Sequence, residues 1–126
     1  MNQNDFVEVV ERYFAAWNET NAERRRALIA QTWTDDASYL DPLMQGQGHA
    51  GIDAMIAAVQ EQFAGHQFHQ TGAVDGHNDR LRFSWELAPE HGAPIVAGTD
   101  FGVVAADGRL QTITGFLDQV PASASA

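Results

Sequence analysis

The chain of 126 residues contains no cysteine and no lysine. Without cysteine it can form no disulfide, thiolate nucleophile or cysteine-based metal site, and without lysine it can form no Schiff base. Few side chains therefore remain for covalent catalysis. The length fits a single domain with a hydrophobic core of its own.

Basic residues are scarce. Seven arginines stand against 17 acidic residues, which gives a formal net charge of −10 at pH 7. No basic stripe can neutralise phosphates, so we expect neither nucleic acid nor a membrane as a partner, and the charge favours neutral or cationic ligands. The first five residues are polar and lack the pattern of a signal peptide, and no apolar run approaches the roughly 20 residues that span a bilayer. We therefore expect a cytoplasmic protein.

Three segments show the periodicity of amphipathic helices. Their boundary signals are a cap at Asn4 or Asp5, a capping box at Thr20–Glu23, and a start after Gly51 with an end at Gly65. The run Arg24–Arg26 inside the second helix is expected to be a solvated face.

The rest of the chain has the pattern of strands separated by turns. An aromatic-apolar strand begins at Trp33, and four later strands at 68–74, 81–87, 95–104 and 110–120 are expected to form an antiparallel meander. The alternation of apolar and polar residues along 80–87 predicts one buried face.

Three helices followed by these strands predict one α+β domain over residues 1–120. We expect a curved, mainly antiparallel sheet of four to six strands to wrap around the helices as a cone-shaped barrel with an open mouth. The small-residue segment 121–126 is expected to be a disordered tail.

Asp41 is the most informative residue, because it directly follows the strand that begins at Trp33 and directly precedes Pro42. The proline pushes Asp41 toward an extended conformation, so the backbone sets the direction of the carboxylate. A positioned carboxylate can act as a base. The alternative is that Asp41 simply forms a turn.

Tyr13 and Asp100 are the other two catalytic candidates. Tyr13 lies on the apolar face of the first predicted helix, and Asp100 lies inside the third strand of the meander. All three residues could converge on one cavity. The alternatives are that Tyr13 is a core aromatic and that Asp100 is an ionised residue paired with Arg82 or Arg109.

The inward faces of the helices and the sheet carry enough apolar side chains to line a small-molecule pocket, although the same side chains could simply fill the core. The expected ligand-contacting residues are Phe14, Trp17, Trp33, Tyr39, Met55, Val59, Phe63, Phe83, Trp85, Ile113 and Leu117.

Five histidines are present, and His66 and His69 form the tightest pair. No third ligand has a spacing that would complete a site, so we predict no metal. His49 is closer to the expected mouth and could contact a ligand, with a surface position as the alternative. The glycines at 46, 48 and 51 lack the strand-to-helix context of a phosphate loop. We predict that the protein needs no cofactor.

The segments Tyr13–Asn18, Trp33–Pro42 and Asp100–Asp118 resemble the nuclear transport factor 2-like superfamily, in its SnoaL-like branch. The resemblance covers nearly the whole chain. It implies a cone-shaped α+β barrel, often dimeric through the outer face of the sheet. The superfamily holds both enzymes and non-catalytic binding domains, so the fold alone does not decide the function.

Within that superfamily the active-site pattern is similar to that of the ketosteroid isomerases. Their general-base aspartate precedes a proline as Asp41 does, their oxyanion-hole tyrosine lies in a stretch similar to Glu11–Tyr13, and their protonated aspartate falls on Asp100. The chain departs from them by an extra stretch around 22–30, which lengthens the second helix. In polyketide cyclases of the SnoaL type the catalytic histidine and aspartate fall on Phe101 and Gly115, which cannot transfer protons.

The resemblance implies that Asp41 removes a proton beside a carbonyl while Tyr13 and a neutral Asp100 donate hydrogen bonds to the enolate oxygen. The resulting prediction is a cofactor-free isomerase for a small apolar carbonyl compound. Two alternatives stay open: a non-catalytic ligand-binding or dimerisation domain, and an enzyme like the polyketide cyclases.

Overall fold

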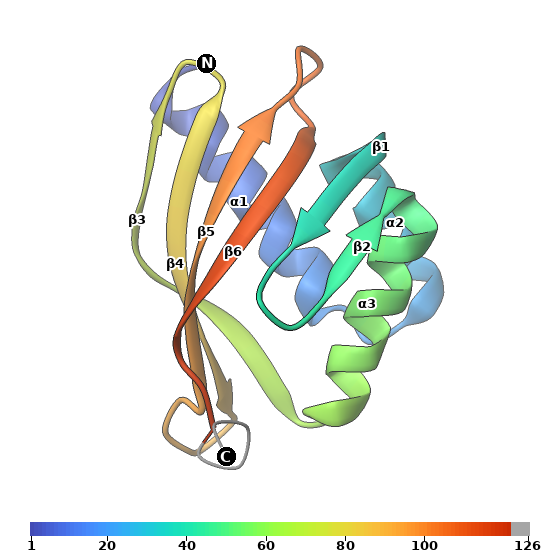
Figure 1. Ribbon diagram of the computed structural model, residues 1–126, viewed down its shortest axis with the longest axis vertical. Coiled ribbons are helices and arrows are strands. Elements are labelled where there is room, and N and C mark those ends of the chain that lie inside the picture. Colours follow the sequence, from blue (N-terminus) through green and yellow to red (C-terminus); the bar gives the residue numbers. More distant parts are fainter. Residues whose placement is uncertain (122–126) are drawn as a thin grey trace.

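The computed structural model describes residues 1–121 and has the predicted α+β architecture (Figure 1). Its elements, in chain order, are α1 (Gln3–Asn18), α2 (Ala22–Thr32), β1 (Trp33–Leu40), β2 (Gln45–Gln47), α3 (Gly48–Gln62), β3 (His66–His77), β4 (Arg80–Pro89), β5 (Val96–Val104) and β6 (Leu110–Gln119). The predicted tail at 121–126 lies, apart from Pro121, outside the described residues. No helix within residues 1–121 is long and apolar enough to cross a membrane.

The six strands form one sheet in the order β2-β1-β6-β5-β4-β3. The predicted antiparallel meander is confirmed, since β3, β4, β5 and β6 pair with one another in sequence. Strand β1 pairs in parallel with β6, and β2 pairs with β1. This order brings the end of β1, and with it Asp41, beside the last strand of the chain.

The sheet curves around the helices. Figure 1 shows α1 passing behind the strands and α3 lying beside β2. The register of β3 against β4 shifts between Thr71 and Asp75, where Gly72 has a φ of +80°. Such an irregularity bends a strand, which allows the long hairpin to wrap over the helices. The inward residues of β4 are buried in the predicted alternation.

All three helix starts differ from the predictions. Helix α1 is capped by Asn2, whose side chain accepts from the backbone N–H of Asp5 at 3.0 Å while the Asp5 carboxylate accepts from Asn2 N at 2.9 Å. Asp5 is therefore the third helical residue and not the cap. The predicted capping box at Thr20–Glu23 is wrong by one residue, because the cap of α2 is Asn21, whose side chain accepts from Arg24 N at 2.9 Å. Helix α3 begins at Gly48 rather than after Gly51.

The prediction that the arginine run is solvated is wrong for Arg25, which is only 6% exposed. Its guanidinium donates to Asp53 at 2.7 Å and to Gln60 at 3.1 Å, both on α3. Consecutive residues of a helix point in directions about 100° apart. Arg25, the middle residue of the run, can therefore face inward although its two neighbours do not. The Gln60 amide in turn donates to the backbone carbonyls of Trp17 and Glu19, at the end of α1.

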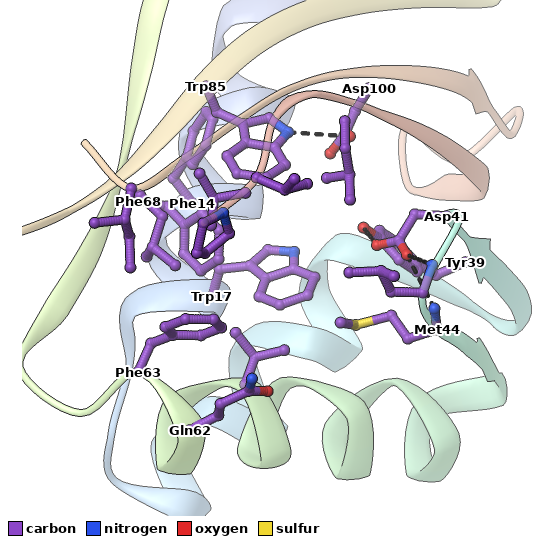
Figure 2. Close-up of a pocket in the computed structure, with 18 of the residues that line it drawn as sticks. Phe14, Trp17, Tyr39, Asp41, Met44, Gln62, Phe63, Phe68, Trp85 and Asp100 are labelled. Carbon is purple, nitrogen blue, oxygen red and sulfur yellow. Dashed lines mark hydrogen bonds between the residues drawn. The ribbon is translucent and has the colours of Figure 1, made fainter. Parts of the chain in front are cut away.

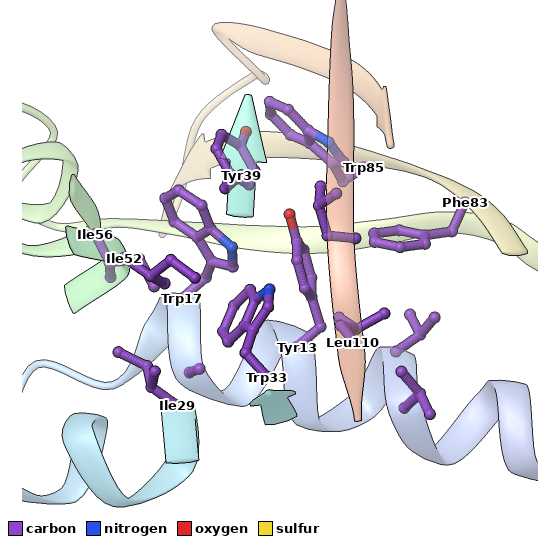
Figure 3. Packing of buried hydrophobic residues seen from close by; sticks show 14 of the residues in the cluster. Tyr13, Trp17, Ile29, Trp33, Tyr39, Ile52, Ile56, Phe83, Trp85 and Leu110 are labelled. Atoms are coloured by element: carbon purple, nitrogen blue, oxygen red, sulfur yellow. The ribbon is translucent and has the colours of Figure 1, made fainter. Parts of the chain in front are cut away.

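The core lies between α1 and the inner face of the sheet (Figure 3). Trp33 is fully buried, and its ring packs against that of Tyr13 at a centroid distance of 5.4 Å. At the other end of α1 the side-chain amide of Asn18 pairs with both backbone groups of Phe68, at 3.0 and 2.8 Å. These bonds hold the start of β3 against α1 and place the Phe68 ring.

Candidate functional site

A cavity of about 400 Å³ opens between α1, α3 and the curved sheet. That volume is in the range of small-molecule sites. Tyr13, Asp41 and Asp100 all line it, so the three candidates from three different elements do meet in one place. Figure 2 shows Phe68, Phe14 and Trp85 on one side of the cavity and Asp41 with Tyr39 on the other.

Seven of the expected ligand-contacting residues line the cavity: Phe14, Trp17, Tyr39, Val59, Phe63, Trp85 and Leu117. Trp33, Met55, Phe83 and Ile113 do not line it and are buried in the core. Each of these four lies on the inward face of its element but further along that element from the cavity. Periodicity identifies the face that a residue occupies, but not its depth.

Sequence reasoning missed the residues that form the rim and the far wall of the cavity: Leu43, Met44, Gln62, Phe68, Leu87, Ile95, Val96, Val120 and Pro121. Phe68 and Leu87 carried a signal, because they pair across β3 and β4 on the inward face. The others lie in turns or at element ends, where no periodicity exists to place them.

Asp41 is held rigidly at the end of β1. Its Oδ1 accepts from the backbone N–H groups of Leu43 at 2.8 Å and Met44 at 3.0 Å, and its Oδ2 accepts from the Tyr39 hydroxyl at 2.7 Å. Its own N–H donates to the carbonyl of Met44 at 3.0 Å, which closes the turn. The turn therefore fixes the orientation of the carboxylate. A positioned base requires this orientation, and an aspartate that only forms a turn would show it as well.

Asp100 is 1% exposed in the middle of β5. Its Oδ2 accepts from the Tyr13 hydroxyl at 2.5 Å, and its Oδ1 accepts from the Trp85 indole N–H at 3.1 Å. The pKa of Asp100 is raised to about 6, because burial outweighs the lowering effect of the hydrogen bonds from Tyr13 and Trp85 and nearby Asp41 adds to the rise. The environment thus favours the protonated form more than solvent would.

The alternative that Asp100 pairs with an arginine is wrong. Arg82 donates to Asp75 at 3.0 Å, and Arg109 donates to Asp107 at 2.8 Å. Both arginines lie away from the cavity, whose lining residues include no basic side chain.

The two tyrosines act as donors to the two carboxylates. Burial raises the pKa of Tyr13 well above its usual value, with further contributions from Asp100 and Tyr39. Burial also raises the pKa of Tyr39, together with the charges of Asp100 and Asp41. Both phenols therefore keep their protons at neutral pH. The extra stretch around 22–30 forms most of α2 and does not remove Tyr13 from the site.

Two glycines make this arrangement possible. A Cβ on Gly115 would lie 2.9 Å from Asp100 Oδ1, 3.1 Å from Asp41 Cβ and 3.3 Å from the Tyr39 hydroxyl. A Cβ on Gly98 would lie only 2.4 Å from the Trp85 ring. Gly115 thus lies where Asp100, Asp41 and Tyr39 come together and where a side chain would not fit, and Gly98 lets the Trp85 indole cross β5 to reach Asp100.

The histidines do not contribute to the cavity lining. His49 contacts the carbonyl of Trp33 at 2.8 Å. His66 and His69 are three residues apart on β3, so their side chains point to opposite faces. Within residues 1–121 no three histidine, aspartate or glutamate side chains lie close enough together to hold a metal ion.

A curved mixed sheet wrapped over three helices, with a cavity between them, is the nuclear transport factor 2-like fold. The chain belongs to the SnoaL-like domain family, whose sequence profile matches residues 10–113.

Solved structures support this assignment. The chain is similar to a putative isomerase of the SnoaL-like family from Agrobacterium tumefaciens str. C58, with 43% identity, coverage of 91% of this chain and 98% of that chain, and a TM-score of 0.87. A putative SnoaL-like polyketide cyclase from Jannaschia sp. CCS1 has 19% identity, coverage of 92% and 87%, and a TM-score of 0.71. An NTF2-like protein of unknown function from Exiguobacterium sp. 255-15 has 18% identity, coverage of 87% and 98%, and a TM-score of 0.69. The last two likenesses concern the fold alone. No curated protein matches the chain.

Proposed function

We propose that the protein is a cofactor-independent isomerase that moves a proton on a small, largely apolar carbonyl compound. The observation that carries this proposal is the meeting of Asp41 and Asp100 across Gly115 in one cavity. Two carboxyl groups in different environments are a common arrangement for acid–base chemistry. The aromatic and aliphatic walls suit an apolar ligand.

The two carboxyl groups would have different roles. Asp41 is oriented by hydrogen bonds from its turn and from Tyr39, and acts as the base. Asp100 is buried, and its raised pKa favours the acid form that can donate a hydrogen bond. Its Oδ1 lies on the side of Gly115, whereas its Oδ2 faces Tyr13.

In the proposed reaction Asp41 takes a proton from the carbon beside the carbonyl, and the electron pair moves onto the carbonyl oxygen as an enolate. Protonated Asp100 donates a hydrogen bond to that oxygen, while the hydrogen bond from Tyr13 to Oδ2 holds the Asp100 carboxyl group in position. If the ketone has a β,γ double bond, this enolate is a dienolate. Asp41 then returns the proton to its γ carbon, which yields the conjugated isomer. One preorganised donor of this kind contributes about 3 kcal/mol to the transition state.

The similarity to a putative isomerase at 43% identity supports this reaction class. The cyclase alternative has less support. Phe101 is 41% exposed and absent from the cavity lining, and Gly115 has no side chain, so neither position offers a group that transfers protons.

A non-catalytic ligand-binding domain is the second candidate, and one observation favours it. The hydrogen bonds of Asp41 to Leu43 and Met44 close a turn, which is a sufficient structural reason for an aspartate at this position. The two candidates differ in what the substitution Asp41→Asn does.

The test follows conversion of a β,γ-unsaturated cyclic ketone to its conjugated form by ultraviolet absorbance. Asp41→Asn keeps an oxygen for the turn but loses the base, so turnover should fall by at least about a hundredfold while ketone binding persists. Asp35→Asn on the same strand, where the side chain is 90% exposed, is the matched control and should leave turnover unchanged. Saturable ketone binding with no turnover in the wild type would favour the binding domain.

We further propose that the protein is a homodimer through the outer face of the sheet. Leu40, Phe101 and Phe116 are 53%, 41% and 59% exposed on β1, β5 and β6. Exposed apolar side chains on adjacent strands suit an interface between copies. A cytoplasmic location and the lack of nucleic-acid and membrane partners stay predictions from the sequence.

A further inference from the structure

Gln62 is a polar side chain on the inward face of α3. It is the last residue of the helix and follows Val59 by three positions, so the two side chains lie on the same face. Both line the main cavity. The preceding inward residues of α3 are apolar and buried: Ile52, Met55, Ile56 and Val59. A glutamine thus stands in the cavity wall where the periodicity of the helix predicts an apolar residue.

The amide of Gln62 is uncommitted, unlike that of Gln60 on the same helix. The Gln60 side chain donates to the backbone carbonyls of Trp17 and Glu19 and accepts from Arg25. The Gln62 side chain is exposed and makes no hydrogen bond to any residue in 1–121. Its oxygen and its two N–H groups are therefore accessible to a ligand in the cavity.

The other hydrogen-bonding side chains of the cavity lining lie elsewhere and are occupied. The hydroxyls of the two lining tyrosines and the indole N–H of Trp85 donate to the two carboxyl groups. The indole nitrogen of Trp17 has almost no accessible surface. Figure 2 shows Asp100 with Trp85 on the sheet side of the cavity and Gln62 with Phe63 on the α3 side. A ligand that reaches across the cavity from the carboxyl groups therefore meets the amide of Gln62.

We propose that Gln62 is a specificity-determining residue, whose amide binds a second oxygen of the ligand away from the carboxyl groups. This subsite rests on the proposed function and narrows its ligand class to carbonyl compounds that carry a further hydroxyl or carbonyl group. An amide donates and accepts, so it fits either group. Two carboxyl groups and no basic side chain line the cavity, so a neutral oxygen group is favoured over a carboxylate or a phosphate. The apolar middle of such a ligand lies against the aromatic lining, which includes Phe14 and Phe68.

The test uses pairs of ligands that differ at one end. In 4-(3-hydroxypropyl)cyclohexanone a hydroxyl group stands where 4-butylcyclohexanone has its terminal methyl group, so the two ketones have the same length. Homologous pairs with a shorter and a longer chain vary the reach from the ketone. Isothermal titration calorimetry measures the Kd of each ligand.

The preference for the hydroxyl ligand over its methyl partner is the readout. Gln62→Leu should lower this preference about fivefold at the chain length that reaches residue 62, because the variant keeps the size of the side chain and loses the amide. Gln67→Leu is the matched control. Gln67 is also exposed, and it precedes the cavity-lining Phe68 on β3, so its side chain points to the opposite face of the sheet. This variant should leave the preference unchanged.

The wild type provides a second readout. The side-chain N–H signals of Gln62 in a ¹H–¹⁵N spectrum, assigned through the backbone, should move further with the hydroxyl ligand than with its methyl partner. If Gln62→Leu does not fold, this comparison decides.

A preference that is equal in the wild type and in Gln62→Leu at every chain length would overturn the subsite. An equal loss in Gln67→Leu would overturn it as well. If the preference is unchanged but Asp41→Asn loses isomerisation, only the subsite is removed. If none of the ketones binds to the wild type, both the subsite and the proposed function are removed.

Discussion

The hydroxyl of Tyr13 donates a 2.5 Å hydrogen bond to Oδ2 of Asp100, and so joins the first helix to the middle of the sheet. The two residues are 87 positions apart in the chain. Because this hydroxyl is committed to Asp100, Tyr13 acts through the carboxyl group and stabilises its ionised form.

Tyr13→Phe should therefore raise the pKa of Asp100 above its value of about 6, since the substitution removes the first of the hydrogen bonds that lower it. The ring remains, so the packing against Phe83 persists. The side-chain carboxyl signal of Asp100 in a ¹³C titration measures the shift. A downward shift would show that Tyr13 does not stabilise the carboxylate.

The pH dependence of isomerisation should follow Asp100. The proposed mechanism needs this group protonated, and its pKa is about 6, so kcat/KM should fall about tenfold per pH unit well above pH 6. The amide of Asp100→Asn does not titrate. The variant should therefore have a lower kcat/KM, and this kcat/KM should no longer fall above pH 6. A wild-type profile that stays flat to pH 8 would contradict the neutral-donor role.

Trp85→Phe and Gly98→Ala should both disrupt the hydrogen bond from Trp85 to Asp100, although they do so in different ways. The first removes the N–H that bonds to Asp100 Oδ1, and the second places a Cβ 2.4 Å from the Trp85 ring and displaces it. Both should raise the pKa of Asp100 and move the basic limb of the rate profile upward.

Gly102→Ala is the matched control for Gly98→Ala on the same strand. The three atoms nearest to a Cβ at Gly102 would belong to the apolar side chains of Ile113, Leu81 and Leu110, at 3.0 to 3.3 Å. It should leave the pKa of Asp100 unchanged. A shift in Gly102→Ala equal to that in Gly98→Ala would show that general disturbance of β5, and not the Trp85 hydrogen bond, sets this pKa.

Arg25→Ala should lower the free energy of unfolding by about 2 kcal/mol, because it leaves Asp53 and Gln60 without their partly buried donor. Arg24→Ala, at a side chain that is 71% exposed, should change it by less than about 0.5 kcal/mol. Urea denaturation followed by tryptophan fluorescence measures both. Equal losses in the free energy of unfolding would show that Arg25 stabilises the fold no more than a solvent-exposed arginine does.

Phe116→Arg should convert the proposed homodimer to a monomer, since it places a charge on an exposed apolar face. Light scattering after size-exclusion chromatography measures the mass in solution. Glu90→Arg, at a residue whose side chain is 84% exposed, is the control and should leave the mass unchanged. A wild-type monomer would refute the dimer, whatever the variants do.

Much of the fold was predictable because it depends on local patterns. The alternation along β4 and the helical periodicity of α1 assign each inward face correctly. Asp41 could be singled out because Pro42 restricts its backbone. Helix starts were less certain, since Asn2 and Asp5 are both good caps and only the reciprocal hydrogen bonds decide between them.

The sequence by itself determined which apolar residues face inward, that three helices precede an antiparallel meander, and that Tyr13, Asp41 and Asp100 are candidates for one site. Only the tertiary structure decided that Arg25 is buried, that Trp85 reaches Asp100 over Gly98, and that Asp41 and Asp100 meet beside Gly115. The physical reason is distance along the chain: periodicity reports the face of one element, whereas these contacts depend on how β1, β4, β5 and β6 pair and on how deep each residue lies in the curved sheet.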